Sequence, residues 1–324
     1  MPSPTPVDDR AGDSLDTADR LARLHDAHAA RLAAVDPLVR PAPPSAGEGD
    51  RLLVSGAVGA LASVRASDLL WVARRAHVLT VRAAEPDADA WAAVLDRWLA
   101  QVAADPAATD AETSATVVVA SRDVDLVAPL VARHFGPASV LAIRGLDRED
   151  PDDWRRPPPG VRIRPAAPAD LPWLLDRSVD LHAWESRFGY VPPRPDARTS
   201  LAGELGEALA RDEGWTWIAE VDGAPVAFVQ VNPPEAAAWV NGATWLAPTG
   251  YLVQAFVEPA LRSSGLGRVL AAAAHARAAE EGWAAMLLHH AGASGWSTPF
   301  WASMGYRPLV TSWMRRPAFR AAAG

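Results

Sequence analysis

Residues 251–268, YLVQAFVEPALRSSGLGR, form the most informative segment of this sequence. An apolar strand, Tyr251–Val257, leads through a turn with an arginine, two serines and two glycines into an alanine-rich helix. Successive backbone N–H groups in such a turn can form a concave anion site, and the helix dipole adds partial positive charge there. The pattern predicts a pyrophosphate-binding helix start or, alternatively, an ordinary helix N-cap formed by Ser263 or Ser264.

The side chains of this turn suit the first interpretation. Glycine at 265 and 267 would supply unusual backbone dihedrals and let phosphates approach the main chain. Arg262 or Arg268 could add a charge-assisted contact. The six-residue Rossmann glycine pattern and a Walker lysine are both absent, which disfavours dinucleotide redox chemistry and nucleotide phosphotransfer.

The elements around this segment alternate between strands and helices in the order β-α-α-β-β-β-α-β-α-β. Asp222-Gly223 is a strong signal for a two-residue hairpin. The strands are expected at 161–165, 215–221, 226–231, 251–257, 284–289 and 309–314, and the helices at 169–179, 197–211, 266–281 and 298–304.

These features resemble the GNAT acetyltransferase superfamily over residues 161–317. Arg262, Gly265 and Gly267 match its Arg/Gln-x-x-Gly-x-Gly/Ala motif, and Val257-Glu258-Pro259 and Phe300-Trp301-Ala302-Ser303-Met304-Gly305-Tyr306 extend the match. The resemblance implies an α/β fold with a mixed, mostly antiparallel sheet flanked by helices. It also implies that acetyl-CoA is the cosubstrate, that no metal is used, and that the strand 251–257 splays from 284–289. The pantetheine arm would enter between these strands. The cofactor-binding residues that it implies are Phe256, Val257, Arg262, Ser263, Ser264, Gly265, Leu266, Gly267, Arg268 and Phe300.

The chain departs from the family pattern at two catalytic positions. Many members have asparagine at the start of the last helix and an acid tyrosine further along, where this chain has Ser294 and Trp301. An indole N–H cannot serve as a proton acid near neutral pH, and Trp301 is expected to be core packing. Either another group protonates the leaving thiolate through water, or no acid is needed because a thiol of pKa about 8.5 is already a tolerable leaving group. The candidates for that group are Ser297, Tyr306, His289 and His290.

The general base is left open among several titratable groups near the expected cleft, namely Glu235, Glu258, His182, Glu185, His289 and His290. At most one of His289 and His290 enters the cleft, because adjacent strand residues face opposite sides. In GNAT folds the loop between the first two helices lines the acceptor pocket, and here it contains His182, Trp184, Glu185 and Tyr190. Its aromatic residues and Glu185 suit a cationic or aromatic amine, and a hydrophobic lid is the alternative.

The first half of the chain is predicted to be a second α/β unit. Strands are expected at 51–54, 60–64, 69–72, 77–82, 115–120 and 139–144, and helices at 17–35, 87–104 and 124–134. His134-Phe135-Gly136-Pro137 precedes a strand much as Ser303-Met304-Gly305-Tyr306 does, so this half is interpreted as a degenerate copy of the second. Ala83-Ala84-Glu85-Pro86-Asp87 replaces the phosphate turn, and its carboxylates and proline predict that this half binds no acyl-CoA. The predicted organisation is a disordered tail, helix and linker over 1–50, a degenerate GNAT-like domain over 51–145, a linker over 146–160 and a catalytic domain over 161–317.

Composition limits the classes of function. The 324 residues carry a formal charge of −8, which disfavours nucleic-acid and acidic-membrane partners, and contain no cysteine, which excludes a thiol acyl-enzyme. No signal peptide or transmembrane span is recognised, so a cytoplasmic protein is expected, as a monomer or homodimer. The sequence thus predicts acetyl transfer from acetyl-CoA to a small-molecule or peptide amine by direct attack in a ternary complex. The alternative is a catalytically silent acyl-CoA-binding or scaffold protein.

Overall fold

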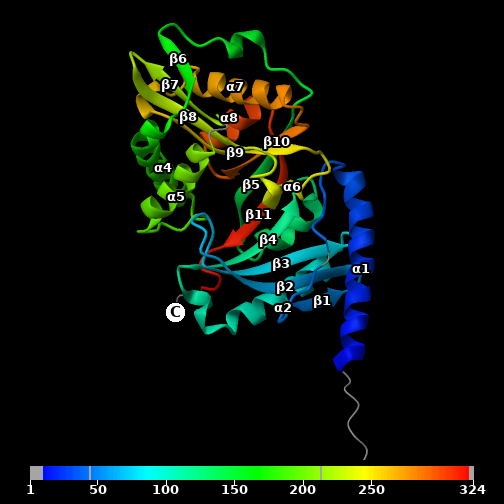
Figure 1. Ribbon diagram of the computed structural model, residues 1–324. Helices are drawn as coiled ribbons and strands as arrows, with labels where there is room; N and C mark the ends of the chain where they lie inside the picture. Colours follow the sequence, from blue (N-terminus) through cyan, green and yellow to red (C-terminus); the bar gives the residue numbers. More distant parts are fainter. Residues whose placement is uncertain (1–9, 44, 212–213, 321–324) are drawn as a thin grey trace, which may run out of the picture.

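A computed structural model of the chain describes residues 10–43, 45–211 and 214–320, and within them one 11-stranded sheet crosses the whole molecule (Figure 1). Its strand order is β1-β2-β3-β4-β11-β5-β10-β9-β8-β7-β6. The pairs β3–β4 and β9–β10 are parallel and the other pairs are antiparallel. The sheet is therefore mixed and mostly antiparallel, as predicted.

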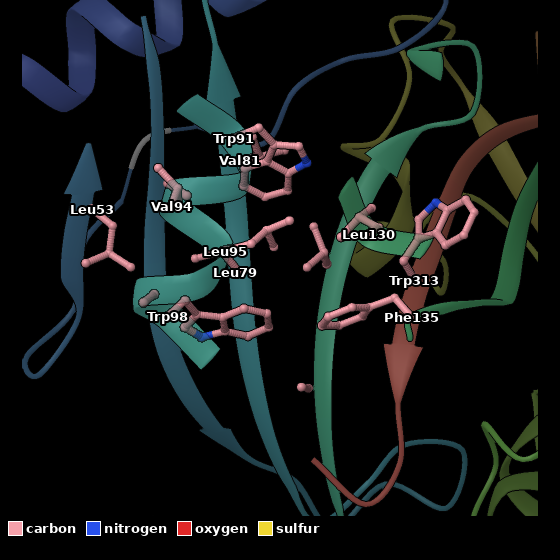
Figure 2. Close-up of a cluster of buried hydrophobic side chains, with 14 of the residues drawn as sticks. Leu53, Leu79, Val81, Trp91, Val94, Leu95, Trp98, Leu130, Phe135 and Trp313 are labelled. Carbon is pink, nitrogen blue, oxygen red and sulfur yellow. The ribbon is translucent and has the colours of Figure 1, made fainter. Parts of the chain in front are cut away.

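The N-terminal half begins with a long helix and then builds the first part of the sheet. Its elements are α1 (Arg10–Val35), β1 (Arg51–Ser55), β2 (Val58–Ala66), β3 (Arg75–Ala83), α2 (Ala88–Ala103), β4 (Thr113–Ala120), α3 (Val127–Val131) and β5 (Gly136–Gly145). Trp91, Trp98 and their neighbours on α2 share one core with residues of β1, β2, β3 and β4, because the helix presents its apolar residues on one face (Figure 2).

The C-terminal half repeats this arrangement and adds two helices at its start. Its elements are β6 (Val161–Pro165), α4 (Leu171–Glu185), α5 (Ala197–Ala210), β7 (Thr216–Val221), β8 (Ala224–Asn232), α6 (Ala238–Asn241), β9 (Thr249–Val257), α7 (Leu266–Glu280), β10 (Ala285–Ala291), α8 (Ser297–Ser303) and β11 (Arg307–Arg315). Alternate residues of β7 contact opposite helical layers: Trp217 packs with α7, and Ile218 packs with α4 and α5. These helices therefore cover opposite faces of the sheet.

The two halves exchange their last strands. β11, from the end of the chain, lies between β4 and β5, and β5 lies between β11 and β10. Trp313 of β11 accordingly packs in the core of the N-terminal half (Figure 2), whereas Val140 and Ala142 of β5 pack in the core of the C-terminal half. Each core is completed by a strand from the other half, so the two predicted units share one sheet although residues 146–160 separate them along the chain.

The hairpin prediction is confirmed by the backbone. Asp222 and Gly223 connect β7 to β8 with φ of 52° and 79°, and Val221 pairs with Ala224. Positive φ at both central residues is the geometry of a two-residue hairpin turn, whose twist matches that of the flanking strands.

Several local predictions need correction. Residues 69–72 form a turn rather than a strand: the Leu69 N–H bonds to Ser67 Oγ, and Leu70 packs against α5. The helix expected over 124–134 is a 3₁₀ turn followed by the short α3. The first helix was expected to start at Thr17, but α1 starts at Arg10, and residues 1–9 lie outside the described part of the chain.

Candidate functional site

The strands β9 and β10 separate halfway along their length. They pair from Thr249–Leu252 to Ala285–Leu288, but β9 continues to Val257 and β10 to Ala291. A bulge coincides with the separation: Gln230 faces Gln254 and Val231 faces Leu252, so Val253 is an extra residue in β9. A bulge bends its strand, which gives a physical cause for the predicted splay. The edge of β9 around Phe256 and Val257 faces this gap without a strand partner from β10.

The turn after β9 prepares the start of α7 as an anion site. Ser263 and Gly265 have positive φ, 63° and 92°, with Ser264 between them. Gly265 is the N-cap residue, and no side chain accepts from the first N–H groups of α7, while Ser264 Oγ donates to the Leu261 carbonyl at 2.6 Å. The alternative of a serine N-cap is therefore wrong. The first N–H groups of a helix have no intrahelical acceptor, so those of Leu266 and Gly267 remain free to bind an anion.

The two glycines of the turn have different roles. Gly265 needs its positive φ, and an added Cβ there would meet nothing closer than Pro158 Cγ at 4.0 Å. Gly267 lies within α7 and has no positive φ, so the expectation of unusual dihedrals is wrong at this position. A Cβ on Gly267 would lie 3.3 Å from Phe300 Cζ and 3.5 Å from Val257 Cγ2. Gly267 thus permits close packing of α7 against α8 and the end of β9.

Cationic and aromatic groups surround this turn. The Arg262 guanidinium lies over the rings of Trp184 and Trp296, at 5.6 and 5.7 Å from their centroids. Arg268 lies over Trp154 at 4.9 Å. Aromatic faces hold a guanidinium without neutralising its charge. Both arginines therefore add positive charge beside the free amides of α7.

The acceptor residues predicted as a loop belong mostly to a helix. His182, Trp184 and Glu185 form the last turn of α4, and Tyr190 follows the helix. The Tyr190 hydroxyl donates to Glu185 Oε2 at 2.9 Å. Burial raises the pKa of Glu185, although the Tyr190 hydroxyl and the Ala291 backbone N–H oppose this shift. His182 is buried against Trp71, and burial lowers its pKa.

His289 belongs to an aromatic cluster beside these residues. Its Nδ1 is 3.0 Å from the Tyr251 hydroxyl, and its ring stacks on Trp239 at 6.0 Å with an interplanar angle of 11°. Neighbouring protein atoms desolvate the ring, and this desolvation lowers the pKa of His289 to about 4. His289 is therefore neutral near pH 7 and can accept a proton but not supply one. The sequence did not single out Tyr251 and Trp239, because only their contacts with His289 distinguish them from other aromatic residues.

Other predicted catalytic residues lie in less suitable places. Glu258 pairs with Arg177 at 2.8 Å, and Glu235 is exposed on the loop before α6. Tyr306 is 4% exposed, and its hydroxyl is 2.9 Å from His275 Nε2 in the core of the C-terminal half. Burial raises the pKa of Tyr306 far above its ordinary value. A buried and hydrogen-bonded phenol of this kind is poorly placed to protonate a thiolate.

The start of α8 contains the remaining candidates. Ser294 Oγ accepts from the Ser297 N–H and donates to Ser297 Oγ, both at 3.1 Å, so these two serines bond to each other at the start of α8. His290 is buried and points away from His289, as predicted from their adjacent positions. Trp301 is buried against Phe300 and Tyr306, in agreement with its expected packing role.

The equivalent place in the N-terminal half is closed. Asp87 is the N-cap residue of α2, and its carboxylate accepts from the Asp89 and Ala90 N–H groups. The end of β3 is also covered, because Arg31 of α1 donates to the Ala83 carbonyl and pairs with Asp123 beyond β4. The first N–H groups of α2 are thus bound by a carboxylate, whereas the corresponding N–H groups of α7 are free.

Among the described residues, no group of three or more His, Asp or Glu side chains is placed to hold a metal ion. None of the described helices combines the length and apolarity needed to cross a membrane.

Comparisons with known proteins complete the description. The model of the acetyltransferase (GNAT) family matches residues 178–306. The fold is similar to that of a GCN5-related N-acetyltransferase from Sphaerobacter thermophilus, at 14% identity, 93% coverage of each chain and a TM-score of 0.54. A second such enzyme, from Kribbella flavida, is 18% identical over 88% of this chain and 94% of that chain, with a TM-score of 0.43. A tandem GNAT protein from the clavulanic acid biosynthesis pathway is 15% identical over 94% and 97%, with a TM-score of 0.43. No curated protein matches the sequence.

Proposed function

We propose, from the membership of residues 178–306 in the GNAT acetyltransferase family, that this chain transfers an acetyl group from acetyl-CoA to an amine by direct attack. The observation that carries the proposal is the uncapped start of α7 beside the gap between β9 and β10. Free helix amides beside two separated strands suit a ligand with a pyrophosphate at one end and an extended arm.

The residues around the cleft fit acetyl-CoA. The amides of Gly265, Leu266 and Gly267 would hold the pyrophosphate, with Arg262 and Arg268 adding charge. The free edge of β9 at Phe256 and Val257 would pair with the pantetheine arm and donate to the thioester carbonyl. A preorganised donor at an oxygen that gains charge in the transition state is typically worth a few kcal/mol. The bound thioester supplies an activated carbonyl and a thiol leaving group.

No acid residue is needed for the departing thiolate. Trp301 replaces the tyrosine of many relatives and is buried, and the buried Tyr306 does not take over its position. A thiol of pKa about 8.5 leaves readily as its anion. The protein's main contribution would be to position an unprotonated amine against the carbonyl.

We further propose that the N-terminal half is a degenerate GNAT-like repeat that completes the fold and binds no acyl-CoA. The parallel pair β3–β4 corresponds to β9–β10, and α2 corresponds to α7. Asp87 places a carboxylate at the N-terminus of α2, where a pyrophosphate would otherwise bind. Like charges would repel each other there.

The experiment that tests the activity mixes the full chain with acetyl-CoA and a panel of amines and follows the release of free thiol. Gly265→Val, expected to damage the anion site, serves as the matched control. Thiol release that requires an amine and disappears in the control is the expected result. CoA binding without turnover on any amine would instead identify a catalytically silent acyl-CoA-binding protein.

A further inference from the structure

The backbone of β10 directs one amide into the gap between β9 and β10. The Gly292 N–H donates to the Ala138 carbonyl, on the side of β5. Because successive N–H groups of a strand point to opposite edges, the Ala291 N–H points to the other edge. There β9 has already separated, since its pairing with β10 ends at Leu252 and Leu288. The Ala291 N–H therefore faces the gap between the two strands.

The Glu185 carboxylate accepts a hydrogen bond from the Tyr190 hydroxyl at 2.9 Å, and the Ala291 N–H lies close enough to the carboxylate to lower its pKa. The last turn of α4 thus places a carboxylate in the gap between the two strands. This is the gap in which the thioester is proposed to lie, so the carboxylate borders the position of the reacting carbonyl.

Glu185 also differs from the other buried carboxylates of the described chain. It is 8% exposed and forms no ion pair among the described residues. Each of the others pairs with an arginine: Asp36 with Arg307, Asp123 with Arg31, Asp150 with Arg144 and Glu220 with Arg164. A buried carboxylate without a cation is costly. The ammonium group of an acceptor would supply the missing positive charge.

We propose that Glu185 is the general base of the acyl transfer, an inference that rests on the proposed function. The acceptor enters as an ammonium ion and pairs with Glu185, which takes one proton and leaves the free amine. The amine nitrogen bonds to the thioester carbonyl carbon, the carbon–sulfur bond breaks, and the sulfur leaves as thiolate. The nitrogen loses a second proton in this step. One of the two protons ends on the CoA sulfur and the other passes to solvent.

The groups around Glu185 are compatible with its role as the general base. Tyr190 hydrogen-bonds to the carboxylate, and burial raises the pKa of Tyr190 far above its ordinary value, so it remains a neutral donor. Tyr251 and His289 lie beyond Tyr190, and His289 is neutral at pH 7 because its pKa is about 4. Among the described residues no charged side chain shifts the pKa of Glu185, and burial raises this pKa toward the range in which a carboxylate is an effective base.

The test compares Glu185→Gln with wild type and with Glu204→Gln, a substitution of a carboxylate on α5. Glutamine keeps the size of the side chain and can still accept from Tyr190. We expect unchanged CoA affinity by calorimetry, an unchanged or higher melting temperature, and a loss of about 100-fold in kcat/KM for the acceptor near pH 7. Glu204→Gln should behave as wild type.

The pH profile separates a base from a merely structural residue. Wild type should show a plateau of kcat/KM between the pKa of Glu185 and that of the acceptor amine. Glu185→Gln should lose the plateau and rise tenfold per pH unit, because only the free amine then reacts. If Glu185→Gln retains the plateau, or shows a raised KM with unchanged kcat, Glu185 is not the general base. The proposed acyltransferase activity would not be contradicted by that result. If wild type acylates no amine while binding CoA, the proposed function fails and the assignment of Glu185 falls with it.

Discussion

Replacing Gly265 and Gly267 by alanine, one at a time, separates the two physical effects in the turn before α7. At Gly265 the φ of 92° is the obstacle, because the space around an added Cβ is open. At Gly267 the backbone is helical, and the obstacle is the Phe300 ring 3.3 Å from the added Cβ. Backbone strain governs the first substitution and packing governs the second.

The expected magnitudes differ accordingly. An alanine held in the left-handed region costs about 1–2 kcal/mol. If the turn relaxes in the free protein to avoid this strain, CoA binding must restore the left-handed conformation at residue 265. The dissociation constant for CoA then rises roughly 5- to 30-fold. At Gly267→Ala the Phe300 ring must shift by a few tenths of an ångström. The energetic cost of this shift is offset by the helix propensity of alanine, which exceeds that of glycine by about 1 kcal/mol. Gly267→Ala should therefore change affinity less than about threefold.

Titration calorimetry with CoA, combined with melting temperatures of both variants, measures these differences. Gly265→Asn provides a control, because asparagine tolerates the left-handed region better than alanine; its affinity should lie between those of wild type and Gly265→Ala. The reasoning is refuted if Gly265→Ala binds CoA like wild type, or if Gly267→Ala is the more damaging change.

Three further predictions follow from named contacts. Arg262→Ala should weaken CoA binding by about 1–3 kcal/mol while leaving the fold intact, and calorimetry showing wild-type affinity would remove Arg262 from the site. Asp87→Ala should lower the free energy of unfolding by about 1 kcal/mol through the lost N-cap, as measured by urea titration, while CoA still binds with a stoichiometry of one; a second site that survives Gly265→Val would contradict the closed N-terminal half. Burial alone would raise the pKa of Asp36, but hydrogen bonds from Arg307 and the Leu38 N–H outweigh it and hold the pKa below 3.8. Its stabilising contribution is therefore present above about pH 4 and lost as the pH falls below it. Urea midpoints should thus drop more for wild type than for Asp36→Asn between about pH 5 and pH 3, and equal drops would show that this ion pair is not the titrating contact.

The exchange of β5 and β11 has a consequence for stability. Trp313 is a core residue of the N-terminal half although it lies near the end of the chain, and Val140 is a core residue of the C-terminal half. Neither half has a complete sheet alone, because each parallel strand pair is continued by a strand from the other half. The two halves are therefore expected to unfold together.

The sequence by itself determined the local features of the site. The dipeptide Asp222-Gly223 requires positive φ at both residues, so the hairpin could be predicted without its surroundings. The segment 251–268 likewise encodes a strand, a turn with glycine at the left-handed position and a helix start. These features depend on contacts within a few residues, and the structure has them where they were expected. The resemblance to the GNAT acetyltransferase family, whose model matches residues 178–306, followed from the same motif.

Only the tertiary structure decided which distant residues meet. A period of two in a strand shows which residues face the core, but it does not name the neighbouring strand, and β11 could not be placed between β4 and β5 from its own pattern. The extra residue Val253 is visible only against the register of β8. Glu185 was one of six equal candidates in the sequence, because its distinction lies in the Ala291 amide, more than a hundred residues away along the chain, and in the absence of a pairing arginine among the described residues. Such contacts arise from the packing of α4 against the splayed strands, which no local pattern encodes.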